Sequence, residues 1–195
     1  MKQFLILFVL VLSLSACKKN LSVFWEDDDA RDLAIFSDTG NNIMSCYVNG
    51  NPFSTLPRNI TYSFPGSYSN YEVEVNRHQL DSVSVKWHGR KTDNSGNPEE
   101  SITVVFYLNK NFTIGEFNAL SGQRLKLDGN NGYFLMKSKG DAKGTGNIYF
   151  HKAEVNFVNG KYEGSIAGLF DARFPDVKIT KGRFDHYLPQ GIFGL

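Results

Sequence analysis

The sequence predicts an all-β fold, either an antiparallel β-sandwich or a rolled, barrel-like sheet of about eight to ten strands. From residue 43 onward, apolar and polar residues alternate with a period of two, as in strands with one buried and one solvated face. The 18 glycines and the aromatic content of 14% suit short strands joined by tight turns. No segment longer than about ten residues combines a helical period with capping residues, so a helical domain is not expected.

The N-terminus has the layout of a secretory signal peptide. A basic start at Lys2 precedes an apolar run over residues 4–14. A permanent transmembrane helix needs roughly 20 apolar residues, so this run is too short to span a bilayer. The sequence Leu14-Ser15-Ala16-Cys17 resembles the bacterial lipobox. That resemblance implies removal of residues 1–16 and lipid modification of Cys17, which would anchor the mature chain in a membrane.

Residues 17–42 are predicted to form a flexible tether. The segment contains the acidic run Glu26–Asp29 and ends in the turn-forming residues 37–42. Few apolar residues lie between them, so burial would not offset the entropy of ordering the chain. One helical turn near Asp29–Phe36 is the only ordered element expected there. The folded body is then predicted to be a single domain over residues 43–195.

The first strands of this domain follow from strict alternation. Valine and glutamate alternate over residues 72–75, and the pattern continues over residues 83–88, where it places Trp87 in the core. Ile102–Leu108 is a continuous β-branched and aromatic run, as expected of a central strand covered on both faces. Asn49-Gly50 is expected to form a tight turn, because both residues favour positive φ.

The C-terminal part of the chain has the clearest strand signals. Asn147–Val158 and Lys161–Asp171 flank Asn159-Gly160, which is a strong signal for a two-residue hairpin turn. Tyr133–Met136 and Val177–Phe184 are predicted to add two further strands. These predictions concern which segments are strands, and they leave the order of strands in the sheets open.

Two stretches carry a family resemblance. One is Cys46-Tyr47-Val48-Asn49-Gly50-Asn51-Pro52-Phe53, and the other is Gly164–Asp171 followed by Val177–Asp185, which contains Ile-Thr-Lys-Gly-Arg-Phe. They resemble the Val-Asn-Gly-x-x-aromatic opening strand and the Ile-Thr-x-Gly-x-Phe closing strand of Bacteroidota lipoproteins of unknown function. The resemblance implies a lipid-anchored, sandwich-like fold, and the family supplies no catalytic residues to carry over.

The closing motif also has a structural explanation. Ile179 and Phe184 are five positions apart, so a regular strand would point them to opposite faces. Gly182 permits a bulge or a close backbone approach between them. We therefore expect a bulge near Gly182 that turns both apolar side chains inward.

Charge and cysteine content exclude several classes of protein. The formal net charge is +1, and residues 121–195 are only mildly basic, with 11 Lys or Arg against 7 Asp or Glu. No stretch concentrates basic residues as nucleic-acid binding requires, so nucleic acid is not an expected partner. With Cys17 lipidated, Cys46 has no disulfide partner in the chain, and we expect it to be a buried small hydrophobe.

Catalytic and metal-binding signals are weak. Glu72 and Glu74 lie on one strand face at a separation used by glycosidases, but any solvated strand with two glutamates has this geometry. The loop Asp93–Glu100 resembles a calcium loop only faintly, because its glycine is misplaced and the twelfth-position glutamate is missing. The four histidines are scattered along the chain. No catalytic residue, metal or cofactor is predicted, and the protein is predicted not to be an enzyme.

The segment from Tyr62 to Tyr71 is the most suggestive candidate for binding. It combines Tyr62, Tyr68 and Tyr71 with serine, glycine and asparagine, a composition typical of adaptable binding loops. Alternatively, the loop packs its own tyrosines over one end of the sandwich. The sequence leaves both interpretations open.

These observations predict a lipid-anchored lipoprotein of the outer membrane, on either its periplasmic or its extracellular face. The expected function is that of a non-enzymatic binding or structural module, whose partners are the membrane, through Cys17, and a glycan or protein ligand. The alternative is a glycan-binding or hydrolytic, carbohydrate-active surface protein whose site is assembled by the fold. A hydrolase would require a concave pocket with two carboxylates or a Ser/His pair within hydrogen-bond reach.

Overall fold

A computed structural model of the chain describes residues 26–27, 30–55, 71–77, 82–92, 98–109, 111–158 and 160–188. Most of these residues are in strands. The strands are β1 Glu26–Asp27, β2 Ala30–Ala34, β3 Ile43–Val48, β4 Asn51–Ser54, β5 Tyr71–Arg77, β6 Ser82–Thr92, β7 Pro98–Asn109, β8 Arg124–Leu127, β9 Gly132–Met136, β10 Thr145–Val158, β11 Lys161–Arg173 and β12 Lys178–Leu188. The described helical segments are α2 Ile114–Asn118 and the 3-10 turn η1 Lys137–Lys139. None of the described helices is long and apolar enough to cross a membrane.

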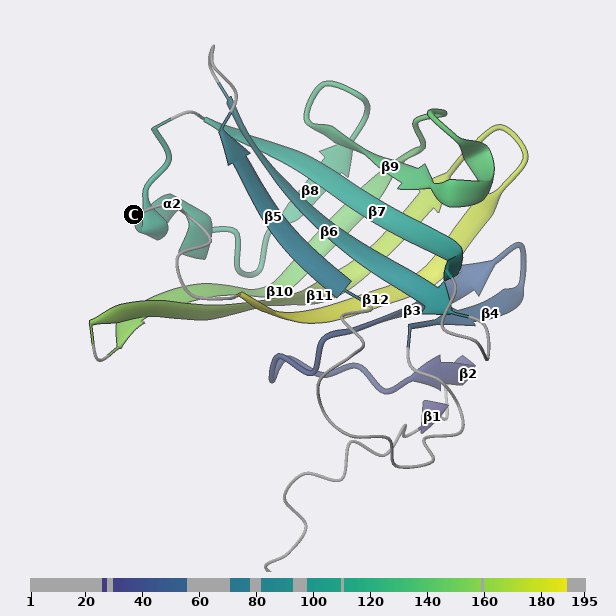
Figure 1. The fold of residues 1–195 in the computed structure, drawn as a ribbon, viewed down its shortest axis with the longest axis horizontal. Helices are drawn as coiled ribbons and strands as arrows, with labels where there is room; N and C mark the ends of the chain where they lie inside the picture. Colours follow the sequence, from purple (N-terminus) through teal and green to yellow (C-terminus); the bar gives the residue numbers. More distant parts are fainter. Residues whose placement is uncertain are drawn as a thin grey trace, which may run out of the picture.

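Two antiparallel sheets pack face to face (Figure 1). The six-stranded sheet has the order β4-β3-β12-β11-β10-β8, and the four-stranded sheet has the order β5-β6-β7-β9. Backbone hydrogen bonds between Phe134 and Gly144 join the edge of the four-stranded sheet to the chain entering β10. The predicted all-β sandwich is confirmed: ten of the twelve described strands form these two sheets, within the predicted eight to ten, and β1 pairs with β2 in a separate two-stranded sheet.

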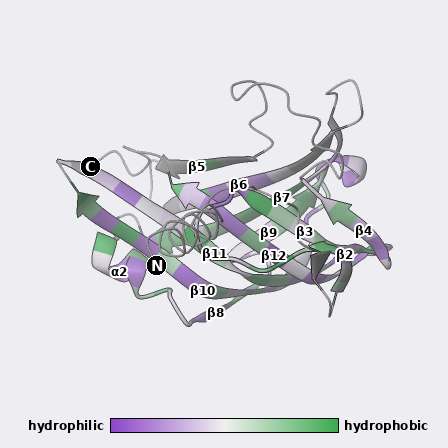
Figure 2. Cartoon of the chain, turned by 90° about the horizontal axis from the view of Figure 1, so that it is seen from below, coloured by the Kyte–Doolittle hydropathy of each residue, from purple (hydrophilic) through white to green (hydrophobic). Residues whose placement is uncertain are grey.

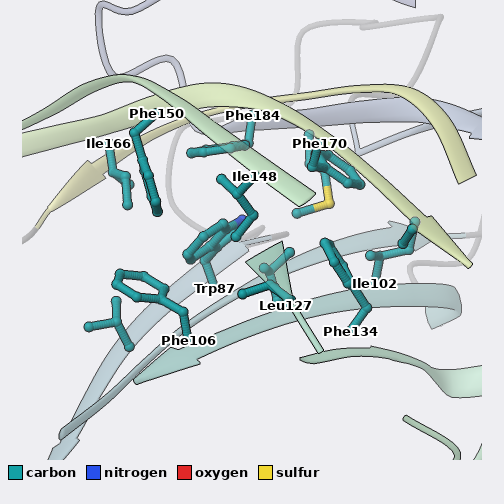
Figure 3. Close-up of a cluster of buried hydrophobic side chains, with 14 of the residues drawn as sticks. Trp87, Ile102, Phe106, Leu127, Phe134, Ile148, Phe150, Ile166, Phe170 and Phe184 are labelled. Atoms are coloured by element: carbon teal, nitrogen blue, oxygen red, sulfur yellow. The ribbon is translucent and has the colours of Figure 1, made fainter. Parts of the chain in front are cut away.

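An aromatic core lies between the sheets (Figure 3). Trp87 on β6 is fully buried, as predicted, with ring centroids 5.6 Å from Phe106 on β7 and 4.9 Å from Phe184 on β12. Phe150 on β10 lies 5.4 Å from Phe106 and completes the contact across the sandwich. The central strand β7 buries Ile102, Thr103, Val104, Val105 and Phe106, which confirms that both of its faces are covered. Hydrophobic and hydrophilic residues alternate along the strands of the six-stranded sheet (Figure 2).

Reciprocal pairs of glycine and phenylalanine join β11 to β12. Gly168 lies directly opposite Phe184, and Phe170 lies directly opposite Gly182. A β carbon at Gly182 would lie 2.7 Å from the Phe170 ring, and one at Gly168 would lie 2.9 Å from Phe184 Cζ. Each ring therefore covers a glycine of the neighbouring strand, so the two strands tolerate no side chain at these glycines.

Two local predictions for the backbone are confirmed. The pairing of β12 shifts register between Thr180 and Arg183, where Lys181 has φ +49°, and both Ile179 and Phe184 are buried in the core. The Asn49-Gly50 turn between β3 and β4 has positive φ at both residues, +50° and +83°. These features depend on local backbone chemistry, which is why the sequence predicted them.

The helix α2 covers an edge of the six-stranded sheet. A capping box starts it: Thr113 Oγ1 accepts from the Glu116 N–H, and the Glu116 carboxylate accepts from the Thr113 N–H at 2.7 Å. At the last residue of the helix, the Asn118 amide oxygen accepts from the Val155 N–H on β10, and its Nδ2 donates to the Val155 carbonyl. Because β8 pairs only with the first part of β10, these bonds satisfy the strand edge that β8 leaves open.

The prediction of a flexible tether over residues 17–42 is wrong for residues 30–42, which pack on the folded body. We call residues 30–42 the N-terminal strap. Its first part is strand β2 and not the predicted helical turn: Leu33 is fully buried, and the Ala34 N–H donates to Ser45 Oγ on β3. A single isolated turn of helix gains too few hydrogen bonds to form, whereas docking on the sheet buries the apolar side chains.

The rest of the strap crosses the outer face of the six-stranded sheet. The buried carboxylate of Asp185 on β12 accepts hydrogen bonds from the Ser37 hydroxyl, the Gly40 N–H at 2.7 Å and the Asn41 N–H at 3.1 Å. Two residues further along β12, the Tyr187 N–H donates to Asn42 Oδ1. Turn-forming residues in the strap thus supply donors to a charge on the sheet, a partner that lies about 145 positions later in the chain.

Candidate binding trough

Two adjoining hollows, of about 540 and 420 Å³, lie on the outer face of the six-stranded sheet. They share Asn147 and Asp171, so we describe them as one basic trough. Strand alternation positions its side chains: Ile148 and Phe150 point into the core, so Asn147 and Tyr149 point outward. The outward side chains of the basic trough are Arg124, Lys126, Thr145, Asn147, Tyr149, Leu169, Asp171, Arg173, Lys178, Thr180, Lys181 and Arg183.

Strand register arranges these side chains in three parallel rows. The first row runs across four strands, with each residue directly opposite the next: Arg124, Tyr149, Leu169 and Arg183. The second row pairs Lys126 with Asn147 and Asn147 with Asp171, and it ends at the bulge that carries Lys181. The third row pairs Thr145 with Arg173 and Arg173 with Lys178.

The trough is strongly cationic although the whole chain is nearly neutral. Six basic side chains, Arg124, Lys126, Arg173, Lys178, Lys181 and Arg183, line it together with a single carboxylate, Asp171. Arg173 and Lys178 are directly opposite each other, which is an unfavourable arrangement for like charges. Within the described part of the chain, Arg124, Arg173 and Lys178 form no ion pair. An external anion can therefore pair with Arg124, Arg173 or Lys178 without displacing an internal salt bridge.

The floor of the trough combines polar and apolar groups. Asn147 Nδ2 donates to both carboxylate oxygens of Asp171, at 3.2 and 3.3 Å, which holds that carboxylate in place. Leu169 is 45% exposed and lies directly opposite Tyr149. A large exposed leucine beside a tyrosine forms a small apolar platform within the charged surface.

The N-terminal strap closes one end of the trough. Arg183 is buried beneath the strap, and its Nη1 donates to the carbonyl of Ala34 at 2.8 Å. The next outward residue of β10, His151, packs edge-on against Phe36 and lies 3.5 Å from Asp38. The trough therefore extends from the strap toward the turn that joins β11 to β12.

The tyrosines predicted to bind ligand are not tested by this geometry. Tyr62 and Tyr68 lie outside the described residues, as does the lipidation candidate Cys17. Tyr71 begins β5, and its side chain lies outside the description. The binding loop over residues 62–71 stays a prediction.

The other chemical candidates have structural explanations where they are described. Burial raises the pKa of the Cys46 thiol, which suits the predicted small hydrophobe and not a nucleophile. His88 is half-buried, with Nδ1 2.8 Å from Thr103 Oγ1. His186 is fully buried, and desolvation, followed by the nearby His88, lowers its pKa to about 3. Asp128 accepts from the Asn130 and Asn131 N–H groups, which stabilise its turn and lower its pKa.

Metal-binding and paired-carboxylate sites can be judged only in part. The described residues contain no group of three His, Cys, Asp or Glu side chains that could hold a metal ion. Glu72 and Glu74 lie two positions apart on β5, opposite His88 and Lys86, and their side chains lie outside the description. The first five residues of the loop Asp93–Glu100 also lie outside it.

Comparison with models of protein families, with curated proteins and with solved structures found no match. The functional argument therefore depends on the fold and the basic trough. Sequence analysis missed this trough because its six basic residues are spread over residues 124–183. Their only signals were the mild basic excess of this region and the outward phase of each residue in its strand.

Proposed function

We propose that the protein is a lipid-anchored binding module of the outer membrane, and that the basic trough is its ligand site. The observation that carries this proposal is the gathering of five exposed basic side chains around one carboxylate in adjoining hollows, on a chain with net charge +1; the sixth, Arg183, is buried beneath the strap. Bringing like charges together is unfavourable for folding, and an anionic ligand offsets that cost.

The composition of the trough supports binding over hydrolysis. Among its described lining residues, Asp171 is the only carboxylate, and neither serine nor histidine is present. A glycosidase requires two carboxylates, and a serine hydrolase requires a nucleophile with a base. The hydrolase alternative therefore gains no support from this site.

The anchor in this proposal is Cys17, within the lipobox-like Leu14-Ser15-Ala16-Cys17. Because the N-terminal strap begins at residue 30, only residues 18–29 separate the anchor from the packed chain. Twelve residues reach at most roughly 40 Å when fully extended. The trough would thus work close to a membrane surface.

The anchor is tested by expressing the full chain and its Cys17→Ser variant in a bacterial host that processes lipoproteins. The original chain is expected to incorporate labelled palmitate and to enter the detergent phase, whereas the variant does neither. Protease treatment of intact and lysed cells then distinguishes extracellular from periplasmic display. Unmodified Cys17 with the mature chain in the aqueous phase would contradict the anchor.

The site is tested by hydrogen-exchange mass spectrometry on the full-length protein in detergent, with and without dialysed cell-envelope extract. We expect slower exchange in segments 124–127, 145–149 and 169–173, which form the trough. The double variant Arg124→Gln/Lys126→Gln should lose this protection. A control of equal charge change, Lys137→Gln/Lys143→Gln, should keep it. Protection confined to other strands, or turnover of a polysaccharide or peptide by the purified protein, would contradict the proposal.

A further inference from the structure

The ligand class can be narrowed from the arrangement of groups within the trough. Resting on the proposed function above, we infer that the trough binds a carboxylated saccharide, with the acidic groups at its cationic rims and sugar hydroxyls at Asp171 and Asn147. Three features of the trough carry this inference: the spacing of its rims, the carboxylate on its floor and its apolar platform.

The cationic rims are too far apart for one small anion. Arg124 and Lys126 lie on β8, whereas the exposed Lys178 and Lys181 lie on β12, three strands away. With strands about 4.8 Å apart, the backbones beneath the two rims are separated by roughly 14 Å. A ligand that contacts both rims must therefore be extended and must carry more than one acceptor. Arginine also favours planar carboxylates, which it binds through two parallel hydrogen bonds.

The floor of the trough opposes a densely charged polyanion. Asp171 lies between the rims, and its carboxylate, held by Asn147, would repel phosphate or sulfate groups placed over it. An ionised carboxylate accepts hydrogen bonds only, so it requires donors, and hydroxyl groups are donors. The Asn147–Asp171 pair can thus hydrogen-bond the hydroxyl groups of a ligand whose charged groups lie only at its ends or edges.

The apolar platform suits the carbon-bearing face of a sugar ring. Tyr149 and Leu169 are directly opposite each other, one row away from Asn147 and Asp171. Leu169 remains 45% exposed, so ligand binding would remove apolar surface from water. Tyrosine provides an amphipathic surface that combines ring contact with hydrogen bonding. An acidic saccharide presents both an apolar ring face for Tyr149 and Leu169 and hydroxyl groups for the neighbouring row of Asn147 and Asp171.

Concavity favours a saccharide chain over a lipid surface. The recognition groups Asn147, Tyr149 and Asp171 line the hollows, and the strap forms a wall at one end, where it contacts Arg183. A planar layer of headgroups would meet the outer ends of the rim side chains and leave the floor unused. A single chain can enter the hollow and contact rims and floor together.

The test measures binding of the full-length protein in detergent to a panel of oligogalacturonate, alginate and hyaluronan oligosaccharides by calorimetry. Each carboxylated oligosaccharide is paired with its carboxyl-reduced form, which keeps the chain and removes the charge. We expect at least one carboxylated member to bind at least tenfold more tightly than its reduced form, and added salt to weaken this binding. Arg124→Gln/Lys126→Gln should lower affinity at least tenfold, whereas Lys137→Gln/Lys143→Gln should leave it within twofold.

Asp171→Asn gives the sharpest discrimination, because the two kinds of ligand predict opposite signs. A saccharide that donates hydroxyls to the carboxylate should bind at least threefold more weakly to the variant. A simple polyanion such as dextran sulfate should bind more tightly, because a negative charge has been removed. Tighter oligosaccharide binding by the variant, or no preference for any carboxylated member over its reduced form, would overturn the inference.

A lipid source of the anionic groups is examined by hydrogen exchange of the protein in phosphatidylcholine nanodiscs, with and without phosphatidylglycerol. If the rate of hydrogen exchange in the trough is the same with and without phosphatidylglycerol, the result supports a saccharide ligand. If phosphatidylglycerol slows that exchange, the result overturns the inference. Failure of the inference is separable from failure of the proposed function. If a neutral ligand protects the trough, only the inference fails, whereas if envelope extract never protects it, the proposed site itself fails.

Discussion

The outer face of the six-stranded sheet has a half covered by the N-terminal strap and an open half that forms the basic trough. In the covered half, Asp185 is buried and accepts hydrogen bonds from Ser37, Gly40 and Asn41. In the open half, Arg173 and Lys178 face each other in water, and neither forms an ion pair within the described residues. The same sheet face therefore contains internally satisfied charges and charges exposed to solvent.

The difference shows how the chain manages charge with burial. A buried carboxylate is costly unless donors surround it, so covering Asp185 requires the precise turn of the strap. Exposed cations are hydrated and need no internal partner, but their mutual repulsion persists at low salt. The covered half thus contributes to stability, and the open half is adapted to an external partner. The predictions below test this division by urea unfolding of the full-length protein in detergent.

The largest expected effect comes from Gly168→Ala, because Gly168 lies in the scaffold beneath both halves. A β carbon there would lie 2.0 Å from the Tyr149 carbonyl oxygen, so backbone must move. We expect a loss of about 3 kcal/mol or more in the free energy of unfolding. Gly115→Ala is the control, because its nearest neighbour would be 3.7 Å away, and it should be neutral or slightly stabilising. Equal effects of the two substitutions would show that β10, β11 and β12 pack less tightly than described.

The second-largest expected effect comes from making the same substitution, aspartate to asparagine, once in each half of the sheet face. Asp185→Asn places an amide against three donors, and we expect a loss of about 2–3 kcal/mol with faster hydrogen exchange in residues 35–42. Asp171→Asn in the open half should change the free energy of unfolding by less than about 0.5 kcal/mol, because this carboxylate is exposed. A similar loss for both variants would mean that the strap does not depend on Asp185.

The third prediction concerns the core face of β12, where His186 lies. Its folded pKa is about 3, below the ordinary value of 6.5, so the unfolded chain binds a proton first as pH falls. The contribution of His186 to the free energy of unfolding is therefore fully present above about pH 6.5 and decreases as the pH falls toward 3. It decreases by about 2 kcal/mol between pH 7 and pH 5. His186→Leu should remove this part of the pH dependence, measured by unfolding at each pH. An unchanged slope in the variant would assign the pH dependence to other groups.

The smallest effect has opposite signs in the two halves. Arg173→Gln removes like-charge repulsion from Lys178, so we expect a gain of about 0.2–0.5 kcal/mol at low salt that disappears at high salt. Lys152→Gln removes a donor to the strap carbonyl of Asp38 and an ion pair with Glu154, so it should lose a comparable amount. Destabilisation by Arg173→Gln would indicate that the open half has an internal partner.

Strand positions and backbone turns could be read from the chain because they depend on neighbours in sequence. Alternation placed Trp87 in the core, and the spacing of Ile179 and Phe184 required a bulge that the structure contains. Glycine and asparagine at Asn49-Gly50 specified their turn through positive φ. In each case the determining atoms lie within a few residues of one another.

The strap could not be read in the same way. Residues 37–42 are polar and turn-forming, which is the composition of a linker, and the apolar anchors before them are the buried Ala30, Leu33 and Ala34 together with Phe36, which packs against His151. Its order depends on Asp185, a residue whose sequence context suggests nothing more than an outward strand position. The composition of a segment indicates the entropy cost of ordering it. It does not indicate that a distant acceptor, here the Asp185 carboxylate, offsets that cost.

By itself, the sequence determined the all-β class, the phase of the strands with clear alternation and the Asn49-Gly50 turn, because strand periodicity and φ preferences act locally. Only the tertiary structure decided which strands are neighbours, and with that the rows that bring Arg124, Tyr149, Leu169 and Arg183 together. Alternation states which face of a strand is solvated, but it does not say whose side chain lies beside it. The basic trough is therefore a property of register, formed when separate strands align their outward residues.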